Sequence, residues 1–385
     1  MNILSLFDGM SCGQQALDRN GIKVDNYFAS EIDKYAITVT MANYPKTKQL
    51  GSVVDVDGYS LPKIDLLIGG SPCQSFSFAG KRKGMATKDE QEILTLDHYL
   101  QLKSEGFEFE GQSYLFWEYM RLLYECKPKY FLLENVMMGE KWEKILSRAI
   151  GVNPIMINSS LLSAQNRQRL YWTNIGLEPS GLFGYPQSTI EQPKDKGILL
   201  KDVIDEVVDE KYFLSEKLII CLNKRKGTTY DTFYSRDING KSRTINSSLA
   251  AMGSADNYII YNMMPKSSKT GEGSTGLLSR KDGKTYCLDT GTTNAVEIKA
   301  IMLGRSEAWG APEKSDGKSY TLCKEQCHGI KNESKIRRLT PIECERLQTV
   351  KDNYTNHVSD SQRYKMLGNG WTVDVIRHIL NYMKI

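Results

Sequence analysis

The chain has 385 residues, of which 40% are hydrophobic and 25% are charged, and its formal net charge is +4. This composition is typical of folded, water-soluble chains with one large or two medium-sized domains. It excludes an integral membrane protein, because no apolar run reaches the length of a bilayer span, and the first residues lack the pattern of a secretory signal. We therefore expect a cytoplasmic protein with no membrane partner.

The eight cysteines follow no regular spacing, which predicts free thiols in a reducing compartment. The nearest approach to a metal signature is Cys323-x3-Cys327-His328. A structural zinc site needs a second pair of ligands at matching spacing, and we find none. We therefore predict no metal site.

The first 175 residues alternate short apolar strands with helical stretches. In chain order we expect a strand at 2–6, a helix up to about 20, a strand at 23–30, a helix at 34–43, and strands at 64–68, 130–133, 154–158 and 170–174. This alternation predicts an α/β fold with a doubly wound sheet of parallel strands. Such sheets bind ligands outside the carboxyl ends of their strands.

Residues 85–112 interrupt this rhythm with a polar, charged segment that is long for a loop in a compact domain. Long loops at strand ends are often functional, whereas a tolerated surface insertion explains the segment equally simply. The sequence does not decide between the two.

The composition changes at about residue 176, where Gly, Ser, Thr, Asn and Lys become frequent, and the sequence from there on predicts a β-rich region. A loose repeat with tight-turn signals recurs at 237–245, 282–288 and 316–322. Between residues 224 and 284, eleven Lys and Arg stand against five Asp and Glu. This charge suits contacts with phosphates and bases, and a solvated loop-rich surface would explain it as well.

Helix signals return near residue 337. Thr340, Pro341 and Glu343 suit the cap, the first position and the third position of a helix. Residues 371–383 carry apolar side chains at helical spacing and should pack on the first domain. We therefore expect one domain from residues 1–175 completed by 366–385, a second from 176–336, and a helical connection at 337–365.

Two features near the N-terminus indicate a nucleotide-like ligand. The segment Phe7-Asp8-Gly9-Met10-Ser11-Cys12-Gly13 is a glycine-bearing turn after the first strand, which lets the backbone approach a ligand closely. Glu31 ends the second strand, where a carboxylate can accept hydrogen bonds from ribose hydroxyls. An ordinary strand-to-helix turn is the alternative.

Two reactive side chains follow later strands. Cys73, in Gly70-Ser71-Pro72-Cys73-Gln74, comes directly after a buried strand, and Glu134 ends the strand at 130–133. Removal from bulk water would raise the pKa of this carboxyl, which suits a general acid. A buried inert thiol and a salt-bridged or capping glutamate are the ordinary alternatives.

A pair of arginines precedes the strand at 170–174. Gln165, Arg167 and Arg169 alternate along an extended segment, so we expect them to share one face. Two guanidinium groups aimed at one place suit a phosphate or a carbonyl oxygen, whereas a solvated edge is the simpler interpretation.

Taken in order, these elements resemble the DNA (cytosine-5) methyltransferase family across the whole chain. The specific motifs are Pro72-Cys73-Gln74, Glu134-Asn135-Val136 and Gln165-x-Arg167-x-Arg169. The opening turn and Gly370-Trp371-x-Val373 are most similar to the eukaryotic de novo branch. In lacking an N-terminal extension, the chain resembles the stand-alone bacterial or phage enzymes of the family.

The resemblance implies sequence-specific transfer of a methyl group from S-adenosylmethionine to C5 of a flipped-out cytosine, leaving S-adenosylhomocysteine. It implies that the Cys73 thiolate adds to C6 of the base and that Glu134 protonates N3. Arg169, together with Arg167, would hold the base and its phosphate.

The resemblance also implies a Rossmann-like cofactor site. Its residues would be Phe7, Asp8, Gly9, Ser11, Gly13, Glu31, Ile32, Ser52, Pro72, Asn369 and Val373. Ser11 stands where many relatives have a second glycine. Ser52 stands where the family usually has an aspartate that reads the adenine amino group, and Asp55 is a candidate substitute.

By the same resemblance, residues 176–336 form a smaller β-rich target-recognition domain, and the partner is double-stranded DNA. We expect a monomer in a bacterial cell or a phage-infected host, with a cognate restriction endonuclease as a possible companion. A tRNA cytosine-5 methyltransferase is disfavoured, because none of the eight cysteines is followed by Phe-Thr. A DNA-binding protein without catalysis is disfavoured because Cys73, Glu134 and Arg169 are all present.

Overall fold

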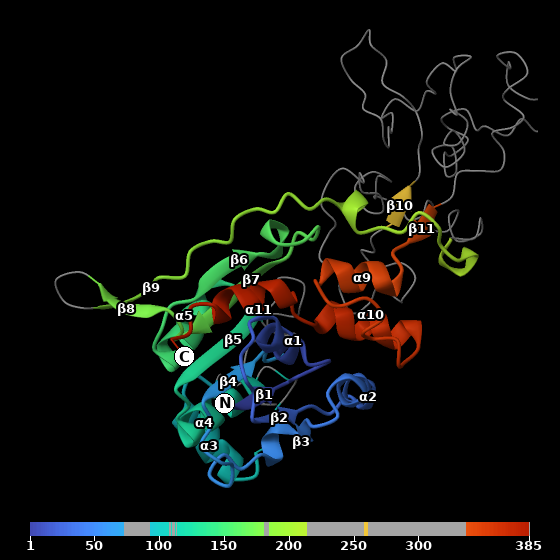
Figure 1. Cartoon of the computed structure of the whole chain (residues 1–385). Coiled ribbons are helices and arrows are strands. Elements are labelled where there is room, and N and C mark those ends of the chain that lie inside the picture. The colour runs from blue at the N-terminus through green and yellow to red at the C-terminus, as the bar shows by residue number, and fades with distance from the viewer. Residues whose placement is uncertain are drawn as a thin grey trace, which may run out of the picture.

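A computed structural model of the chain describes residues 1–72, 93–107, 109, 112, 114–180, 185–213, 258–260 and 336–384. Its centre is a seven-stranded sheet in the order β3-β2-β1-β4-β5-β7-β6 (Figure 1). The strands are β1 (Asn2–Leu6), β2 (Asn26–Ser30), β3 (Lys48–Gln49), β4 (Leu66–Gly69), β5 (Tyr130–Val136), β6 (Ile155–Asn158) and β7 (Gln168–Thr173). The order reverses at β1 and β4, where such sheets bind ligands.

Helices cover both faces of this sheet. They are α1 (Cys12–Arg19), α2 (Lys34–Asn43), α3 (Leu96–Ser104), α4 (Leu115–Cys126), α5 (Glu140–Ile150), α9 (Pro341–Leu347), α10 (Asp360–Asn369) and α11 (Val373–Leu380). Successive side chains of β1 point to opposite faces of the sheet, so Ile3 lies in the hydrophobic core on one face, and Leu4 and Leu6 lie in the core on the other. The first core includes α1 and α11, and the second includes α3, α4 and α5.

The C-terminal segment packs on the first domain, as expected. In Figure 1 the red helix α11 lies beside the blue helix α1, and Arg19 of α1 donates to Asp374 of α11 at 2.8 Å. The predicted helix start is also confirmed, because Thr340 and Glu343 cap α9 reciprocally and Pro341 is its first residue. Residues from opposite ends of the chain thus share one hydrophobic core.

The structure corrects two expectations about the sheet. The strand at 170–174 was expected to continue the parallel series, but β7 runs antiparallel to both β5 and β6. The strand expected at 130–133 continues as β5 to Val136, so Glu134 lies within the strand and pairs with Tyr171. The reversal of β7 brings the residues that precede it to the end of β5 that carries Glu134.

The polar segment at 85–112 is not wholly a loop. Its described part contains α3, with Thr95 as the N-cap, and Tyr99 and Leu102 are buried in the second core. Residues 73–92 lie outside the described residues. The polar residues around Tyr99 and Leu102 concealed the helical spacing of these two apolar side chains in the sequence.

Residues 176–213 begin with the antiparallel hairpin of β8 (Leu177–Ser180) and β9 (Tyr185–Ser188), and continue along the C-terminal helices. Lys196 pairs with Asp374 at 2.7 Å, and the backbone N–H of Asp205 donates to Glu343. Two short η turns lie in this segment, at Leu200–Asp202 and Glu210–Tyr212.

Most of the predicted second domain lies outside the described residues, including the three repeats and Cys323-x3-Cys327-His328. Within the basic stretch at 224–284, the structure describes β10 (Tyr258–Ile260), which pairs with β11 (Ile336–Arg338). The domain boundaries therefore stay predictions.

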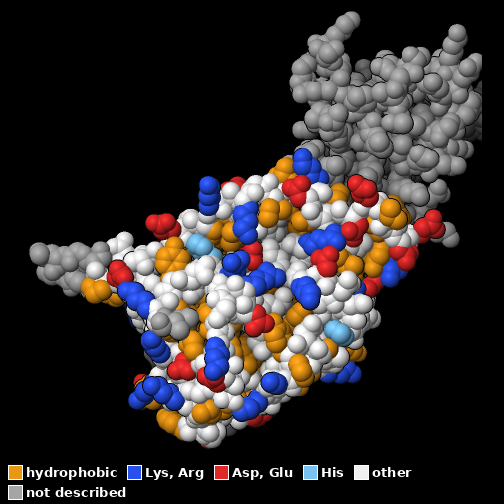
Figure 2. Space-filling model, viewed as in Figure 1, with side chains coloured by type: hydrophobic (Ala, Val, Ile, Leu, Met, Phe, Trp, Pro, Cys, Tyr) orange, Lys and Arg blue, Asp and Glu red, His pale blue; other side chains and the backbone are white. Residues whose placement is uncertain are grey.

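The described surface carries mixed charge. On the face shown in Figure 2, Lys and Arg side chains are interspersed with Asp and Glu. This face is consistent with the small net charge of +4. Among the described residues, no helix is long and apolar enough to cross a membrane.

Candidate active site

The turn after β1 has an unusual backbone. Phe7, Gly9 and Ser11 all have φ between 56° and 57°, in the left-handed region. A left-handed conformation costs an L-residue about 1–2 kcal/mol, and glycine adopts it freely. A Cβ on Gly9 would meet no atom within 4 Å, so the space beside this turn is open to a ligand.

Glu31 holds this turn against β2. Its Oε2 accepts the backbone N–H of Gly9 at 2.7 Å, and its Oε1 accepts those of Ile32 and Asp33 at 2.7 and 2.8 Å. Ile32 beside it is 73% exposed, which is high for an isoleucine. A carboxylate, an open glycine turn and an exposed apolar side chain fit the sugar and base of S-adenosylmethionine.

Asp8 points into the protein rather than towards that space. Its Oδ1 accepts the hydroxyl of Tyr27 at 2.8 Å, and its Oδ2 accepts the hydroxyl of Ser11. Burial raises the pKa of Asp8 to about 6, although the hydroxyl hydrogen bonds act in the opposite direction. The side chain fixes the shape of the turn, including the left-handed Ser11.

The next glycine of the turn motif serves packing. A Cβ on Gly13 would lie 2.4 Å from Cδ1 of Ile68 on β4. Only glycine lets α1 approach the sheet this closely. Gly13 therefore sets the distance between the first helix and the strand that leads to Cys73.

Ser52 follows β3 and caps the one-turn helix η1 (Val53–Asp55), because its Oγ accepts the N–H of Val54 at 3.4 Å. Ser30 Oγ donates to the Gly51 carbonyl oxygen at 2.8 Å and ties this loop to β2. Asp55, the candidate substitute for the usual acid, is exposed. Ser52 therefore lies at the same sheet edge as Glu31.

Two of the predicted catalytic groups, Glu134 and Arg169, meet near the ends of β4 and β5. Nε of Arg169 lies 3.0 Å from Oε1 of Glu134, and both side chains are largely buried. The side chain of Asn135 donates to Ser71 Oγ at 3.2 Å, which anchors the segment leading into Pro72. Cys73 itself lies outside the described residues, but Ser71 and half-buried Pro72 place the start of its segment beside Glu134.

Arg167 lies near Arg169 but has different hydrogen-bond partners. It is 3% exposed and donates to the carbonyl oxygens of Gly368 and Gly370 at 3.2 and 3.0 Å. Burial and the nearby positive charge of Arg169 lower the pKa of Arg167 to about 9, which leaves it charged at neutral pH. Its described contacts join the segment before β7 to the last turn of α10 and the loop that follows it.

Gln165 is likewise turned into the protein. Its Nε2 donates to the carbonyl oxygen of Leu347 and to Oε1 of Gln348, both at 3.2 Å. Gln165 and Arg167 reach the same region, because Gln348 also donates to the Gly370 carbonyl oxygen, whereas Arg169, which lies within β7, pairs with Glu134.

The loop between α10 and α11 supplies a residue that the sequence motifs left unassigned. A Cβ on Gly70 would lie 2.9 Å from Nε1 of Trp371 and 3.2 Å from Oε2 of Glu134. Trp371 therefore packs at the end of β4, next to the acid. The sequence signal for it was its place in Gly370-Trp371-x-Val373. Asn369 is exposed at the end of α10, and Val373 is fully buried in the first core.

A family model for the C-5 cytosine-specific DNA methylases matches residues 1–384. The chain belongs to this family. The resemblance inferred from the motifs is thereby confirmed, and this methylase is an enzyme that methylates cytosine in DNA.

The most similar relatives include phage and bacterial enzymes. The methylase is 28% identical to the orphan methyltransferase M.SPRI of Bacillus phage SPR, over 98% of this chain and 96% of that protein. It is 26% identical to the type II methyltransferase M.BanI of Aneurinibacillus aneurinilyticus, over 95% of this chain and 91% of that protein.

The fold of the methylase is similar to solved structures at lower identity. DNMT2 of Spodoptera frugiperda has a TM-score of 0.58 and 19% identity, over 99% of this chain and 98% of that one. The methyltransferase EhMeth of Entamoeba histolytica has a TM-score of 0.59 and 14% identity, over 99% and 97%. The predicted α/β, Rossmann-like fold class is confirmed.

Proposed function

We propose that this methylase transfers a methyl group to C5 of a flipped-out cytosine through a covalent adduct with Cys73. The observation that carries the proposal is the meeting of Glu134, Arg169 and the segment Ser71–Pro72 at one sheet edge. When bound, S-adenosylmethionine supplies an electrophilic sulfonium methyl group.

The chain's own residues would act on the cytosine. The Cys73 thiolate forms a bond to C6 while Glu134 gives a proton to N3, which makes C5 nucleophilic. After C5 is methylated, N3 returns its proton to Glu134, a base removes the C5 proton, and the bond between sulfur and C6 breaks with the thiolate as leaving group. Arg169 would hold the base while Glu134 acts.

The cofactor would lie over the turn at Gly9, with Glu31 at the ribose and Ile32 against the adenine. Phe7, Ser11, Gly13, Ser52, Pro72, Asn369 and Val373 would complete or support this site, most of them through backbone shape. Asp8 would act indirectly, through its hydrogen bonds to Tyr27 and Ser11.

A denaturant-resistant complex with DNA containing 5-fluorocytosine tests the covalent step. Fluorine at C5 cannot leave as a proton, so the wild type should remain attached to the DNA. Cys73→Ala should form no such complex and no methylated product, yet still bind S-adenosylhomocysteine. Normal methylation by Cys73→Ala would overturn the proposal.

For site selection we propose the region 176–336 as the target-recognition domain, with its basic stretch at 224–284 facing the major groove of double-stranded DNA. Its composition supports this, with eleven Lys and Arg against five Asp and Glu in that stretch. Replacing the region with that of a relative should change the methylated sequence and preserve the chemistry. An active chimera that keeps the original site would place the determinants elsewhere.

The biological setting follows from the relatives only as a proposal. M.BanI carries the name of a type II methyltransferase and M.SPRI that of an orphan. Either a cognate endonuclease or a solitary protective role fits a monomeric enzyme of a bacterium or phage. A tRNA substrate has weaker support, because none of the eight cysteines is followed by Phe-Thr.

A further inference from the structure

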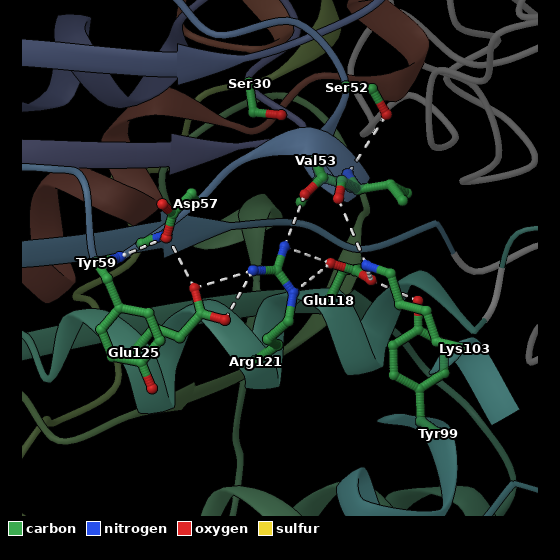
Figure 3. Close-up of polar contacts among 12 residues, drawn as sticks. Ser30, Ser52, Val53, Asp57, Tyr59, Tyr99, Lys103, Glu118, Arg121 and Glu125 are labelled. Atoms are coloured by element: carbon green, nitrogen blue, oxygen red, sulfur yellow. Dashed lines mark hydrogen bonds and ion pairs between the residues drawn. The ribbon is translucent and has the colours of Figure 1, made fainter. Parts of the chain in front are cut away.

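An ion cluster around the buried Glu118 lies beneath the loop that carries Ser52 (Figure 3). Glu118 of α4 is 0% exposed and lies between Lys103 of α3 and Arg121 of α4. Its Oε1 is 2.6 Å from the Lys103 ammonium, and its Oε2 is 2.6 Å from the Arg121 guanidinium. A carboxylate without solvent requires such partners, because a buried unpaired charge is strongly unfavourable.

Lys103 and Arg121 each donate a further hydrogen bond to the backbone of η1. Arg121 donates to the Val53 carbonyl oxygen at 3.1 Å, and Lys103 donates to the Val54 carbonyl oxygen at 3.4 Å. Arg121 also pairs with Glu125 at 2.9 Å, so two acids and two bases balance in charge. The cluster therefore holds the backbone of η1 from below.

The same loop is held from the other side by residues of the candidate cofactor site. Ser30, which precedes Glu31, donates to the Gly51 carbonyl oxygen, and Ser52 accepts the N–H of Val54. With serine in place of an acid at position 52, this loop offers a ligand the Ser52 hydroxyl, its backbone groups and the exposed carboxylate of Asp55. The direction of those groups depends on the position of η1.

We infer that Lys103 is a positioning residue for S-adenosylmethionine, which acts by holding η1 so that the loop at Ser52 faces the adenine. This assigns a role to part of the polar segment at 85–112, since α3 brings Lys103 to η1. The inference rests on the proposed function, because it takes the cofactor to lie along the ends of β2 and β3.

Tyr99 provides a matched control within the same cluster. Its hydroxyl donates to Oε1 of Glu118 at 2.5 Å, as Lys103 does, but it has no hydrogen bond to η1 in the described structure. Tyr99→Phe therefore loosens Glu118 without releasing the Val54 carbonyl. Lys103→Met removes both contacts while keeping the apolar stem of the side chain.

The test measures S-adenosylhomocysteine binding to the full-length chain by titration calorimetry. Lys103→Met should raise the Kd about three- to tenfold, the range of one ordinary hydrogen bond, since the contact from Lys103 to Val54 is long at 3.4 Å, while Tyr99→Phe and Lys103→Arg stay within about twofold of the wild type. In turnover assays, KM for S-adenosylmethionine should rise in Lys103→Met with little change in kcat. Hydrogen exchange at residues 53–56 should be faster in this variant without ligand.

An unchanged Kd in Lys103→Met, or an equal loss in Tyr99→Phe, would overturn the inference and leave the cofactor assignment intact. If hydrogen exchange at residues 53–56 in Lys103→Met matched that of the wild type, Lys103 would not hold η1 in place. This conclusion would stand whatever the overall stability of the variant. Failure of the wild type to bind S-adenosylhomocysteine would overturn the proposed cofactor itself.

Discussion

Glu134 and Arg169 form a largely buried ion pair, with 3.0 Å between Oε1 and Nε, although they lie on antiparallel strands 35 positions apart in the chain. The pair exists because β7 inserts between β5 and β6 in the reverse direction. A cytosine entering this place would meet a carboxyl group and a guanidinium group together. Both groups are already largely buried, so they need not be desolvated when the base binds.

Replacement of Glu134 by glutamine should slow methyl transfer by about 10²–10⁴-fold, the usual contribution of a general acid or base. Glutamine keeps the size of the side chain and a hydrogen-bonding oxygen, but it cannot give up a proton as a carboxylic acid does. Single-turnover assays with tritiated cofactor measure the effect. S-adenosylhomocysteine affinity serves as the control and should not change. A rate within a few-fold of the wild type would remove Glu134 from the chemistry.

The two arginines should fail differently when each is replaced by methionine. Arg167→Met should cost about 1–3 kcal/mol of unfolding free energy, because the buried Gly368 carbonyl oxygen loses the hydrogen bond from Arg167 and the Gly370 carbonyl oxygen keeps only the one from Gln348. Arg169→Met should chiefly lower turnover. Urea unfolding and methylation assays on both variants separate the effects. An Arg167→Met protein of normal stability that binds DNA poorly would instead indicate direct DNA contact.

Asp8 should make stability depend on pH. Its folded-state pKa is raised from 3.8 to about 6, so ionisation is harder in the folded protein and this group lowers stability as pH rises from about 4 to 6. Asp8→Asn removes that titration. The unfolding free energy of the variant relative to wild type should therefore increase between pH 4.5 and 7.5. Urea unfolding at both pH values measures it, and a constant difference would contradict the burial argument.

Gly70→Ala should damage the site through a steric contact. The added Cβ would lie 2.9 Å from Nε1 of Trp371, so the indole must move from its place beside Glu134. A misplacement of about 1 Å lowers turnover on the order of 100-fold. Gly139→Ala is a suitable control, because its Cβ would meet no atom within 4 Å and its φ is −69°. Equal turnover in both variants would show that Trp371 has no part in the site.

Much of this protein could be predicted from local patterns. The strand at 2–6, the helix at 34–43 and the capping box at Thr340 and Glu343 are as expected, because periodicity and capping depend on neighbours within a few positions. The ends of parallel strands meet at one sheet edge. The motifs at Gly9, Glu31 and Glu134 could therefore be assigned to one site before any contact was known.

Other features required the tertiary structure. The polar residues of the segment 85–112 do not reveal that Lys103 reaches η1. The alternation of side chains along an extended segment does not reveal that Arg167 binds Gly368 and Gly370, or that Arg169 binds Glu134. The direction of a side chain depends on which distant segment packs against it. Arg167 and Gly368 lie 201 positions apart, a separation at which no local propensity acts. Packing of the C-terminal helices on the first domain decided the contacts of Arg167, since a buried charge takes whichever partners the surrounding chain provides.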